Sequence, residues 1–426
     1  MDKRSYNRID ETVFSSTLPN GLKVFVVKKS GFRKCYAFFA TDYGGADRRF
    51  KLGGKWIDTP KGVAHFLEHK MFDTPDGNAL TLLSANGASP NAYTSTEMTA
   101  YHFECTDNFE ENLKVLLDFV SVPYFTADSV EKEKGIIGQE IKMIEDAPQY
   151  MMYYGLLKSL YKHNPIRDSV AGTIDSISGI TEKTLYDCHN VFYNPSNMAL
   201  CVVGDVDPER VLDIAEKTVV SGAGEIPQRD YGADETLKPA EKRVVSALEV
   251  GMPLFFIGSK AAPAANGKAY LKNDLVGSLA MRLIAGSSSP LFLRLYESGL
   301  INNEFAAQFD SASGASYSIV GGESRDPNRV FDELKSEIAR ITASGMDEKY
   351  FLRTKKAVEG RQLRALNSFD AISGGCVSGY FKDYDFFELA DILDEIELSD
   401  VISFVKKCLN PDNMAISIIE PVKKEN

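Results

Sequence analysis

Two histidines and a glutamate stand close together in GVAHFLEHKMF, the segment that begins at Gly62. His65 and His69 are four residues apart, and Glu68 directly precedes the second histidine. Residues four apart lie on one face of a helix, so both imidazoles can bind a single zinc ion. The glutamate beside them can take a proton from a water molecule bound to that ion. The whole chain has only 5 histidines, which makes this pairing unusual.

A catalytic zinc ion needs three protein ligands and a water molecule, so a third ligand should lie elsewhere in the chain. The segment KGIIGQEIKMIED offers Glu140, which stands with Ile137 and Ile141 on the apolar stripe of an amphipathic helix. A carboxylate there costs free energy unless it is paired or bound to a metal. Glu133 is two helical turns earlier on the same face and could support the site from behind. A salt bridge from Glu140 to a lysine or arginine is the alternative explanation.

The elements that must hold these residues mix helices and strands. Thr59 and Pro60 predict a helix start before the first histidine, with a capping hydroxyl followed by proline. Apolar alternation after the turn at Asn20 predicts a strand, and CYAFFATDYGG predicts a second one. DNFEENLKVLLDFV and SVEKEKGIIGQEIKMIED are the clearest helices. This mixture favours an α+β fold, in which helices pack on a mostly antiparallel sheet.

The chain also repeats itself at about half its length. NPSNMALCVVGDV begins at Asn194 and NPDNMAISIIEPV at Asn410, an offset of 216 residues (410 − 194). Each segment predicts an Asn-Pro turn followed by a buried strand. The offset is too long for a solenoid and favours two duplicated domains. We therefore predict a zinc-binding domain over residues 1–222, a linker rich in Gly, Pro and charge over residues 223–241, and a second, non-catalytic domain over residues 242–426.

Composition disfavours several classes of function. The chain has 426 residues, of which 44% are hydrophobic and 25% charged, and its formal net charge is −12. A nucleic-acid-binding protein needs a basic face, so this class is disfavoured. We expect no signal peptide and no membrane insertion, because no apolar run approaches the ~20 residues of a membrane span. The 6 cysteines lack a Cys-x-x-Cys spacing, so we expect reduced thiols in a cytoplasmic protein.

The motif His65-x-x-Glu68-His69 resembles the inverted zinc motif of the pitrilysin/insulinase metallopeptidases, the inverzincins. The downstream segment with Glu133 and Glu140 is similar to that family, as are LPNGLKVFVV, NAYTSTEMTAY and the duplicated halves. The length is similar to that of the short bacterial members, which are related to the β subunit of the mitochondrial processing peptidase. The resemblance implies that His65, His69 and Glu140 bind zinc, that Glu68 is the catalytic base, and that Glu133 is a supporting catalytic acid.

The sequence NAYTS resembles the edge strand on which this family docks its substrate. The residues concerned are Asn91, Ala92 and Tyr93. An extended peptide can form main-chain hydrogen bonds with an exposed strand, which gives binding that tolerates many sequences. An ordinary edge strand without a substrate is the alternative. Together these features imply a zinc-dependent endopeptidase that hydrolyses short unfolded peptides or leader segments.

The second half departs from the family's pattern at two positions. Active members carry an arginine four residues before a Gly-Leu pair and a tyrosine three residues after its glycine. Here the glycine is Gly299, and the two positions hold Leu295 and Asn302. Since short family members dimerise, we expect a dimer with a zinc-less paralogue that supplies the Arg/Tyr pair. The alternative is a homodimer in which Arg294 or Tyr296, adjacent but out of register, reaches the site.

Two other functions stay open. The chain could be a non-catalytic or regulatory subunit of a two-chain peptidase complex, although such members typically lose the zinc motif that this chain keeps. It could also be a small-molecule enzyme or a binding module stapled by zinc. A structural zinc ion would be closed by four protein ligands and would have no need of Glu68.

Overall fold

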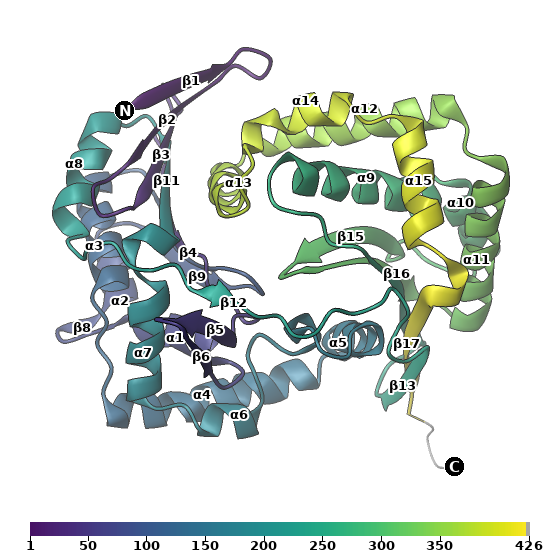
Figure 1. The fold of residues 1–426 in the computed structure, drawn as a ribbon, viewed down its shortest axis with the longest axis horizontal. Coiled ribbons are helices and arrows are strands. Elements are labelled where there is room, and N and C mark those ends of the chain that lie inside the picture. The colour runs from purple at the N-terminus through teal and green to yellow at the C-terminus, as the bar shows by residue number, and fades with distance from the viewer. Residues whose placement is uncertain (423–426) are drawn as a thin grey trace. The chain divides into compact units, whose positions relative to one another are not determined.

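The computed structural model describes residues 1–422, which form two compact units. Each unit is a sheet with helices packed against it, which confirms the predicted α+β class (Figure 1). Both units gather segments from distant parts of the chain: unit 1 comprises Met1–Ile141, Ser169–Asp230 and Leu363–Phe387, and unit 2 comprises Lys142–Asp168, Tyr231–Gln362 and the residues from Glu388 onward. The domain boundaries predicted above divide the sequence by its duplication, and they stay a prediction.

Unit 1 is built on a seven-stranded sheet with the order β1-β2-β3-β11-β4-β10-β9. All neighbouring strands in it are antiparallel except β3 and β11, which run parallel. Strand β9 is therefore an edge strand. The strands are β1 (Asp2–Tyr6), β2 (Glu11–Thr17), β3 (Lys23–Lys28), β4 (Cys35–Thr41), β9 (Ser89–Thr94), β10 (Thr99–Cys105) and β11 (Met198–Gly204).

The helices of unit 1 cover both faces of this sheet. They are α1 (Val63–Met71), α2 (Ala79–Ala85), α3 (Phe109–Ser121), α4 (Ala127–Glu145, whose last turn belongs to unit 2), α6 (Ile174–Ser178), α7 (Glu182–Phe192), α8 (Pro208–Thr218) and α13 (Phe369–Phe381). Small additional strands are β5 (Arg49–Leu52) and β6 (Lys55–Asp58), together with the hairpin of β7 (Asp73–Thr74) and β8 (Gly77–Asn78). The sites discussed below depend mainly on α1, α4 and the edge strand β9.

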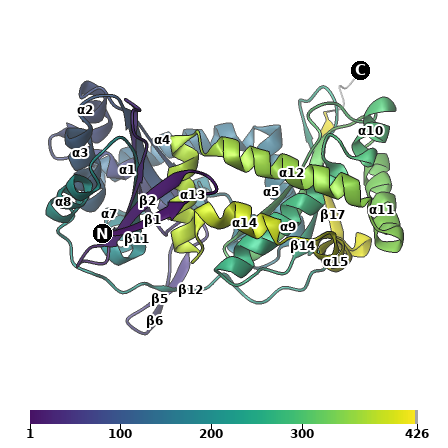
Figure 2. The same cartoon turned by 90° about the horizontal axis from the view of Figure 1, so that it is seen from above.

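Helix α13 comes from late in the chain, yet it covers one face of the unit 1 sheet (Figures 1 and 2). Alternate residues of β4 and β11 pack there against the apolar side of α13: Tyr36, Phe38, Ala40, Ala199, Cys201, Val203, Phe369, Ile372, Cys376 and Val377. Because side chains alternate along a strand, Ala37 and Phe39 point to the opposite face. Helix α3 contacts β4 and β10.

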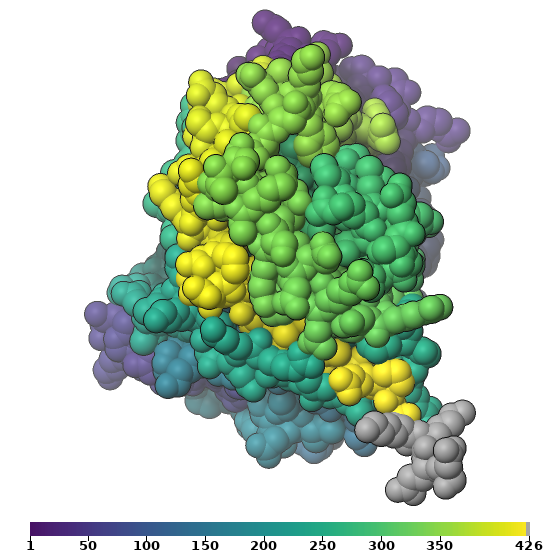
Figure 3. Space-filling model, turned by 90° about the vertical axis from the view of Figure 1, so that its right-hand side faces the viewer, coloured from purple at the N-terminus to yellow at the C-terminus, as the bar shows by residue number. Residues whose placement is uncertain are grey.

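Unit 2 repeats the sheet topology of unit 1. Its order, β13-β17-β14-β16-β15, corresponds strand by strand to β3-β11-β4-β10-β9. The strands are β13 (Arg243–Leu248), β14 (Leu254–Ala261), β15 (Ala306–Ala312), β16 (Ala315–Glu323) and β17 (Met414–Pro421). The helices are α5 (Pro148–Leu160), α9 (Lys268–Ala285), α10 (Pro290–Glu297), α11 (Pro327–Ser344), α12 (Glu348–Ala365), α14 (Leu389–Asp394) and α15 (Leu398–Cys408). Figure 3 shows a face of unit 2 made largely of the later residues, in green and yellow.

The sequence repeat corresponds to equivalent turns and strands. Asn194 and Asn410 each accept a hydrogen bond from the backbone N–H two residues later, and each turn leads into an interior strand of its sheet, β11 or β17. Both strands are buried, as predicted. The duplication in the sequence is therefore a duplication of the sheet, with the same strand at the same place in each copy.

Most of the predicted linker, residues 223–241, forms neither helix nor strand. A short strand in it, β12 (Gln228–Arg229), pairs with β5 in unit 1. Within unit 2, the carboxylate of Glu235 accepts hydrogen bonds of 2.7–3.0 Å from the backbone N–H groups of residues 162–164. It also forms a 3.1 Å ion pair with Lys260. Although burial alone would raise it, these hydrogen bonds lower the pKa of Glu235 to about 2.

The helix with the two histidines begins later than predicted. Helix α1 starts at Val63, and Gly62 precedes it with a φ of 92°. The hydroxyl of Thr59 donates to the backbone oxygen of Arg48 rather than capping the helix. A Cβ atom on Gly62 would lie 2.6 Å from the oxygen of Ala171, so both the left-handed backbone and this close approach require glycine.

One helical stretch, Lys268–Glu297, is long and apolar enough to cross a membrane by length and composition. Its most apolar window is 67% buried inside the fold. Helix α9, which forms most of this stretch, contacts β15, β16 and the neighbouring helices of unit 2. The stretch therefore serves as the core helix of its unit.

Candidate metal centre

The side chains of His65, His69 and Glu140 meet in unit 1, where α1 lies beside α4. Nε2 of His65 is 3.5 Å from Oε1 of Glu140, and Nε2 of His69 is 3.5 Å from Oε2 of the same carboxylate. One ligand atom from each of the three residues lies within 4.8 Å of the others. Among the described residues, this is the group of histidine, cysteine and acidic side chains that could hold a metal ion.

The local sequence explains this convergence. His65 and His69 lie one helical turn apart on α1, and their ring centroids are 4.6 Å apart. Glu140 lies on α4 beside Ile137 and Ile141, which are buried in the core. The carboxylate itself is only partly buried, and its ion pairs among the described residues are with the two histidines. The alternative of a salt bridge to lysine or arginine is therefore not what holds Glu140.

The three residues fit a zinc ion. Tetrahedral zinc with bonds of about 2.1 Å to nitrogen and oxygen separates neighbouring ligand atoms by about 3.4 Å. The two pairs at 3.5 Å are close to this value. Two imidazole nitrogens and one carboxylate are also a ligand set of catalytic zinc sites, which keep one position open. The donor chemistry and the spacing therefore both suit a catalytic rather than a structural ion.

Glu133 fixes the orientation of the His69 ring through Nδ1, the ring nitrogen that does not face Glu140. Its Oε1 accepts a 3.0 Å hydrogen bond from Nδ1 of His69, which directs Nε2 of the ring toward Glu140. The other oxygen lies 3.9 Å from Nζ of Lys70, a buried lysine that also pairs with Asp73. Such a carboxylate fixes the orientation of a metal-binding histidine and raises its basicity.

Electrostatics favour charge separation between the histidines and the carboxylates of this site. Burial alone would lower the pKa of His69, but the hydrogen bond that it donates to Glu133 and the charges of Glu68 and Glu140 raise it overall. The hydrogen bond with His65 lowers the pKa of Glu140, against the effect of burial. A bound metal ion would take the place of a proton on Nε2 of each histidine, because the ligating atoms must be deprotonated, while His69 would keep the Nδ1 proton that it donates to Glu133.

Glu68 also belongs to α1, and its side chain is buried beside the three candidate ligands. Its Oε2 accepts a 2.7 Å hydrogen bond from the hydroxyl of Thr94, the last residue of β9. The hydroxyl of Thr99 lies 3.4 Å from that of Thr94. The sequence analysis did not identify Thr94 as a functional residue. The one signal available was its place in NAYTS, directly after the predicted docking residues.

The predicted docking residues lie on the edge strand beside the metal centre. Asn91, Ala92 and Tyr93 belong to β9, which pairs with β10 on one side and with no described strand on the other. Helix α1 contacts β9. Asn91 is exposed, and the Tyr93 side chain is 38% exposed. The structure thus brings these three residues near the three candidate ligands, and a free strand edge is available there.

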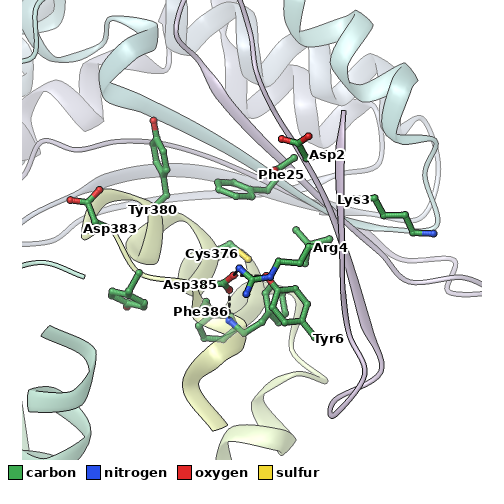
Figure 4. Close-up of a pocket in the computed structure, with 14 residues that line it drawn as sticks. Asp2, Lys3, Arg4, Tyr6, Phe25, Cys376, Tyr380, Asp383, Asp385 and Phe386 are labelled. Carbon is green, nitrogen blue, oxygen red and sulfur yellow. Dashed lines mark hydrogen bonds and ion pairs between the residues drawn. The ribbon is translucent and has the colours of Figure 1, made fainter. Parts of the chain in front are cut away.

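A cavity of about 360 Å³ lies elsewhere in unit 1, between β1 and the end of α13 (Figure 4). Arg4 points to Asp385 and forms a 2.6 Å ion pair with it. The hydroxyl of Tyr6 donates to the same carboxylate. Aromatic rings, among them Phe25 and Tyr380, form much of the wall. The charges of Arg4 and Asp385 therefore satisfy one another, and they tie the first strand to the segment that follows α13.

The two unusual positions of the second half are occupied by structural side chains. Leu295 is 1% exposed in the core of unit 2. The side-chain amide of Asn302 donates a 2.7 Å hydrogen bond to Glu323. Neither residue has a long side chain that could contact a distant carbonyl group.

Arg294 and Tyr296, the two neighbouring candidates, differ in how firmly their side chains are held. Arg294 forms a 2.9 Å ion pair with Glu337, which also binds Arg340. Tyr296 is 46% exposed, and its ring stacks on that of Phe292 with centroids 5.8 Å apart. Arg294 would have to leave a buried carboxylate to act elsewhere, whereas stacking on Phe292 is what holds the Tyr296 side chain within the described part of the chain.

Comparison with known proteins agrees with this geometry. Residues 53–174 match the model of the family described as Insulinase (Peptidase family M16), and residues 179–358 match the one described as Peptidase M16 inactive domain. An "Uncharacterized zinc protease YmfH" of Bacillus subtilis (strain 168) is 38% identical over 423 residues, which are 98% of each chain. The β subunit of the mitochondrial-processing peptidase of Caenorhabditis elegans is 28% identical over 243 residues, 55% of this chain and 50% of that protein.

Solved structures show the same similarity. A putative M16-like peptidase from Alicyclobacillus acidocaldarius superposes with a TM-score of 0.93 at 32% identity, covering 96% of this chain and 98% of that one. A structure of pitrilysin superposes with a TM-score of 0.76 at 17% identity, covering 99% of this chain and 46% of that one. At that identity the second match shows the fold alone.

Proposed function

The chain belongs to the insulinase family, peptidase family M16, and we propose that it is a zinc-dependent endopeptidase acting on short unfolded peptides or leader segments. The observation that carries this proposal is the meeting of two imidazole nitrogens and one carboxylate within 4.8 Å, with Glu68 beside them. The similar protein of Bacillus subtilis is named a zinc protease. Together the donor set and the family support a hydrolytic rather than a structural metal ion.

In the proposed mechanism, His65, His69 and Glu140 would hold a zinc ion. When bound, the ion supplies Lewis acidity, which lowers the pKa of a water molecule to ~7 and polarises a peptide carbonyl. Glu68 takes the proton from the attacking water and later delivers it to the nitrogen of the leaving amine. Glu133 keeps Nε2 of His69 directed at the ion through the 3.0 Å hydrogen bond to Nδ1.

The substrate would bind as an additional strand on the free edge of β9. Main-chain groups of Asn91, Ala92 and Tyr93 would form hydrogen bonds with the peptide backbone. Such binding requires an extended peptide, because a folded segment cannot offer its backbone to a strand edge. This requirement supports short unfolded peptides or leader segments as the substrate class.

We further propose that the active form is a dimer with a zinc-less paralogue. Leu295 and Asn302 stand where active family members carry an arginine and a tyrosine, and both are engaged in unit 2. A partner chain that has the pair would complete the stabilisation of the substrate oxygen, a role worth ~3 kcal/mol for a single donor. A homodimer that uses Tyr296 is the alternative.

The decisive experiment is cleavage of a mixed library of short peptides, with and without a chelator, read by mass spectrometry. We expect cleavage by the protein with its natural partner chain, loss of cleavage with the chelator, and recovery when zinc is added back. Cleavage that resists the chelator would contradict the proposal. Absence of cleavage in every mixture of chains would favour the non-catalytic subunit instead.

A further inference from the structure

Unit 2 contains a second pocket, of about 400 Å³, whose polar lining consists of hydrogen-bond donors (here called the arginine pocket). It lies between one face of α12 and the end of α9 with the loop that follows. The polar residues that line it are Arg282, Ser287, Ser288, Tyr350, Arg353, Thr354 and Arg361, and no aspartate or glutamate is among the lining residues. The chain as a whole has 60 acidic and 48 basic residues, so a pocket of this composition is unexpected.

The three arginines of the pocket are not neutralised by the protein. Among the described residues, none of Arg282, Arg353 and Arg361 forms an ion pair, unlike Arg294 and Arg340, which share Glu337. Burial and the nearby charge of Arg361 both lower the pKa of Arg282. Like charges brought together without a counter-charge are unfavourable. An anion in the pocket would remove this repulsion.

Tyr350 forms part of the wall of the pocket. Its hydroxyl is buried but has no hydrogen-bond partner among the described residues. A buried polar group without a partner costs free energy, so such groups normally have one. The guanidinium of Arg353 lies 5.9 Å from the centre of the Tyr350 ring. The ring of Tyr350 and a guanidinium group therefore lie side by side in the lining of the pocket.

The duplicated topology relates the helices around the pocket to those that carry the candidate metal ligands. Helix α9 is the first helix after β14, as α1 is the first helix after β4, and α12 is the second helix after β16, as α4 is the second after β10. Since the two sheets have the same strand order, α9 and α12 are the counterparts of α1 and α4. The arginine pocket therefore lies between the counterparts of the two helices that carry the candidate metal ligands.

We propose that the arginine pocket binds a small multivalent oxyanion of the phosphate class, such as a pyrophosphate group. Guanidinium groups suit phosphate because they donate two parallel hydrogen bonds, and they stay charged at every physiological pH. The hydroxyls of Ser287 and Ser288 add neutral donors. A pocket of a few hundred Å³ is large enough for a small ligand. This binding site is distinct from the metal centre, and it does not depend on peptidase activity.

The test is titration calorimetry of the full chain with sodium pyrophosphate, without metal or peptide. We expect saturable binding of one pyrophosphate per chain. Arg361→Gln should weaken binding about tenfold or more, because it removes charge-assisted hydrogen bonds. The matched control is Arg364→Gln, an exposed arginine on the same helix that does not line the pocket. It should change the affinity less than about twofold.

Three outcomes would overturn the proposal. The first is absence of saturable binding by the parent chain. The second is equal weakening in Arg361→Gln and Arg364→Gln, which would indicate attraction to the general surface charge. The third is tighter binding of citrate than of pyrophosphate, which would assign the pocket to carboxylates. A thermal unfolding curve for each variant shows whether it is folded, and the exposed position of Arg361 makes its substitution well tolerated.

Discussion

The hydroxyl of Thr94 donates a 2.7 Å hydrogen bond to Oε2 of Glu68. One residue of this pair ends the edge strand β9, and the other is the proposed base on α1. The strand proposed to bind the substrate therefore also orients the group proposed to act on it. Any displacement of β9 would move the carboxylate as well.

Thr94→Val should lower kcat by about tenfold, because a misplaced catalytic group costs one to two orders of magnitude in rate. Thr94→Ser keeps the hydroxyl and should retain activity within about threefold. Steady-state kinetics on one cleaved peptide would separate the effect on kcat from that on KM. Equal activity of the valine and serine variants would show that the hydrogen bond has no positioning role.

His65→Ala should lose bound zinc, with at least about a tenfold decrease in affinity, because only two protein ligands would remain. The measurement is elemental analysis of the purified protein after dialysis. His163→Ala is the control, since His163 is exposed and outside the metal group. Full retention of metal by His65→Ala would disprove the assigned ligand set.

Glu68→Gln should keep the zinc and the fold but lose peptide cleavage. The amide cannot accept the proton, and a general base contributes ~10²–10⁴-fold to the rate. Zinc content and peptide cleavage should be measured on the same preparation. Cleavage at the parent rate would exclude Glu68 as the base.

Glu133→Gln should weaken zinc binding about 10–100-fold, because a carboxylate behind a metal-binding histidine contributes that much. Glu131 provides a matched control on the same helix, with a side chain that is 75% exposed and paired with Lys134. Competition with a zinc-sensitive dye would measure both variants. The hypothesis fails if Glu131→Gln and Glu133→Gln have the same affinity.

The isolated chain should have little peptidase activity, and activity should appear on mixing with a zinc-less paralogue that carries the Arg/Tyr pair. The reason is that Leu295 and Asn302 cannot donate to a substrate oxygen. If the chain alone is fully active and Tyr296→Phe or Arg294→Ala abolishes that activity, the homodimer is correct and the mixed pair is wrong.

Much of the metal centre could be predicted from local spacing. His65, His69 and Glu140 are recognisable because helical periodicity places each on a defined face, and the structure brings them together. Thr94 could not be predicted in this way, because its hydrogen bond to Glu68 spans 26 residues and depends on how β9 lies against α1. The helix start at Thr59 was wrong because Thr59 hydrogen-bonds to the distant Arg48.

The arginine pocket was even less predictable from local spacing in the sequence. Arg282 and Arg361 are about 80 residues apart, and no short spacing connects them. Only the duplicated strand order places α9 beside α12, and strand order is a long-range property that periodicity does not contain. The sequence repeat at Asn194 and Asn410 predicted that two copies exist, but not what the second copy had become.

The position of α13 has a consequence for the newborn chain. Until residues 363–387 have left the ribosome, the sheet of unit 1 lacks the helix that covers Phe38, Cys201 and Val203. The apolar face of the sheet therefore stays uncovered during most of translation. At ~5–20 residues per second this lasts many seconds. A fragment ending at residue 222 would have the proposed zinc ligands yet keep this face exposed. Its recovery from cells would therefore depend on chaperones, or on supplying the missing helix as a separate peptide.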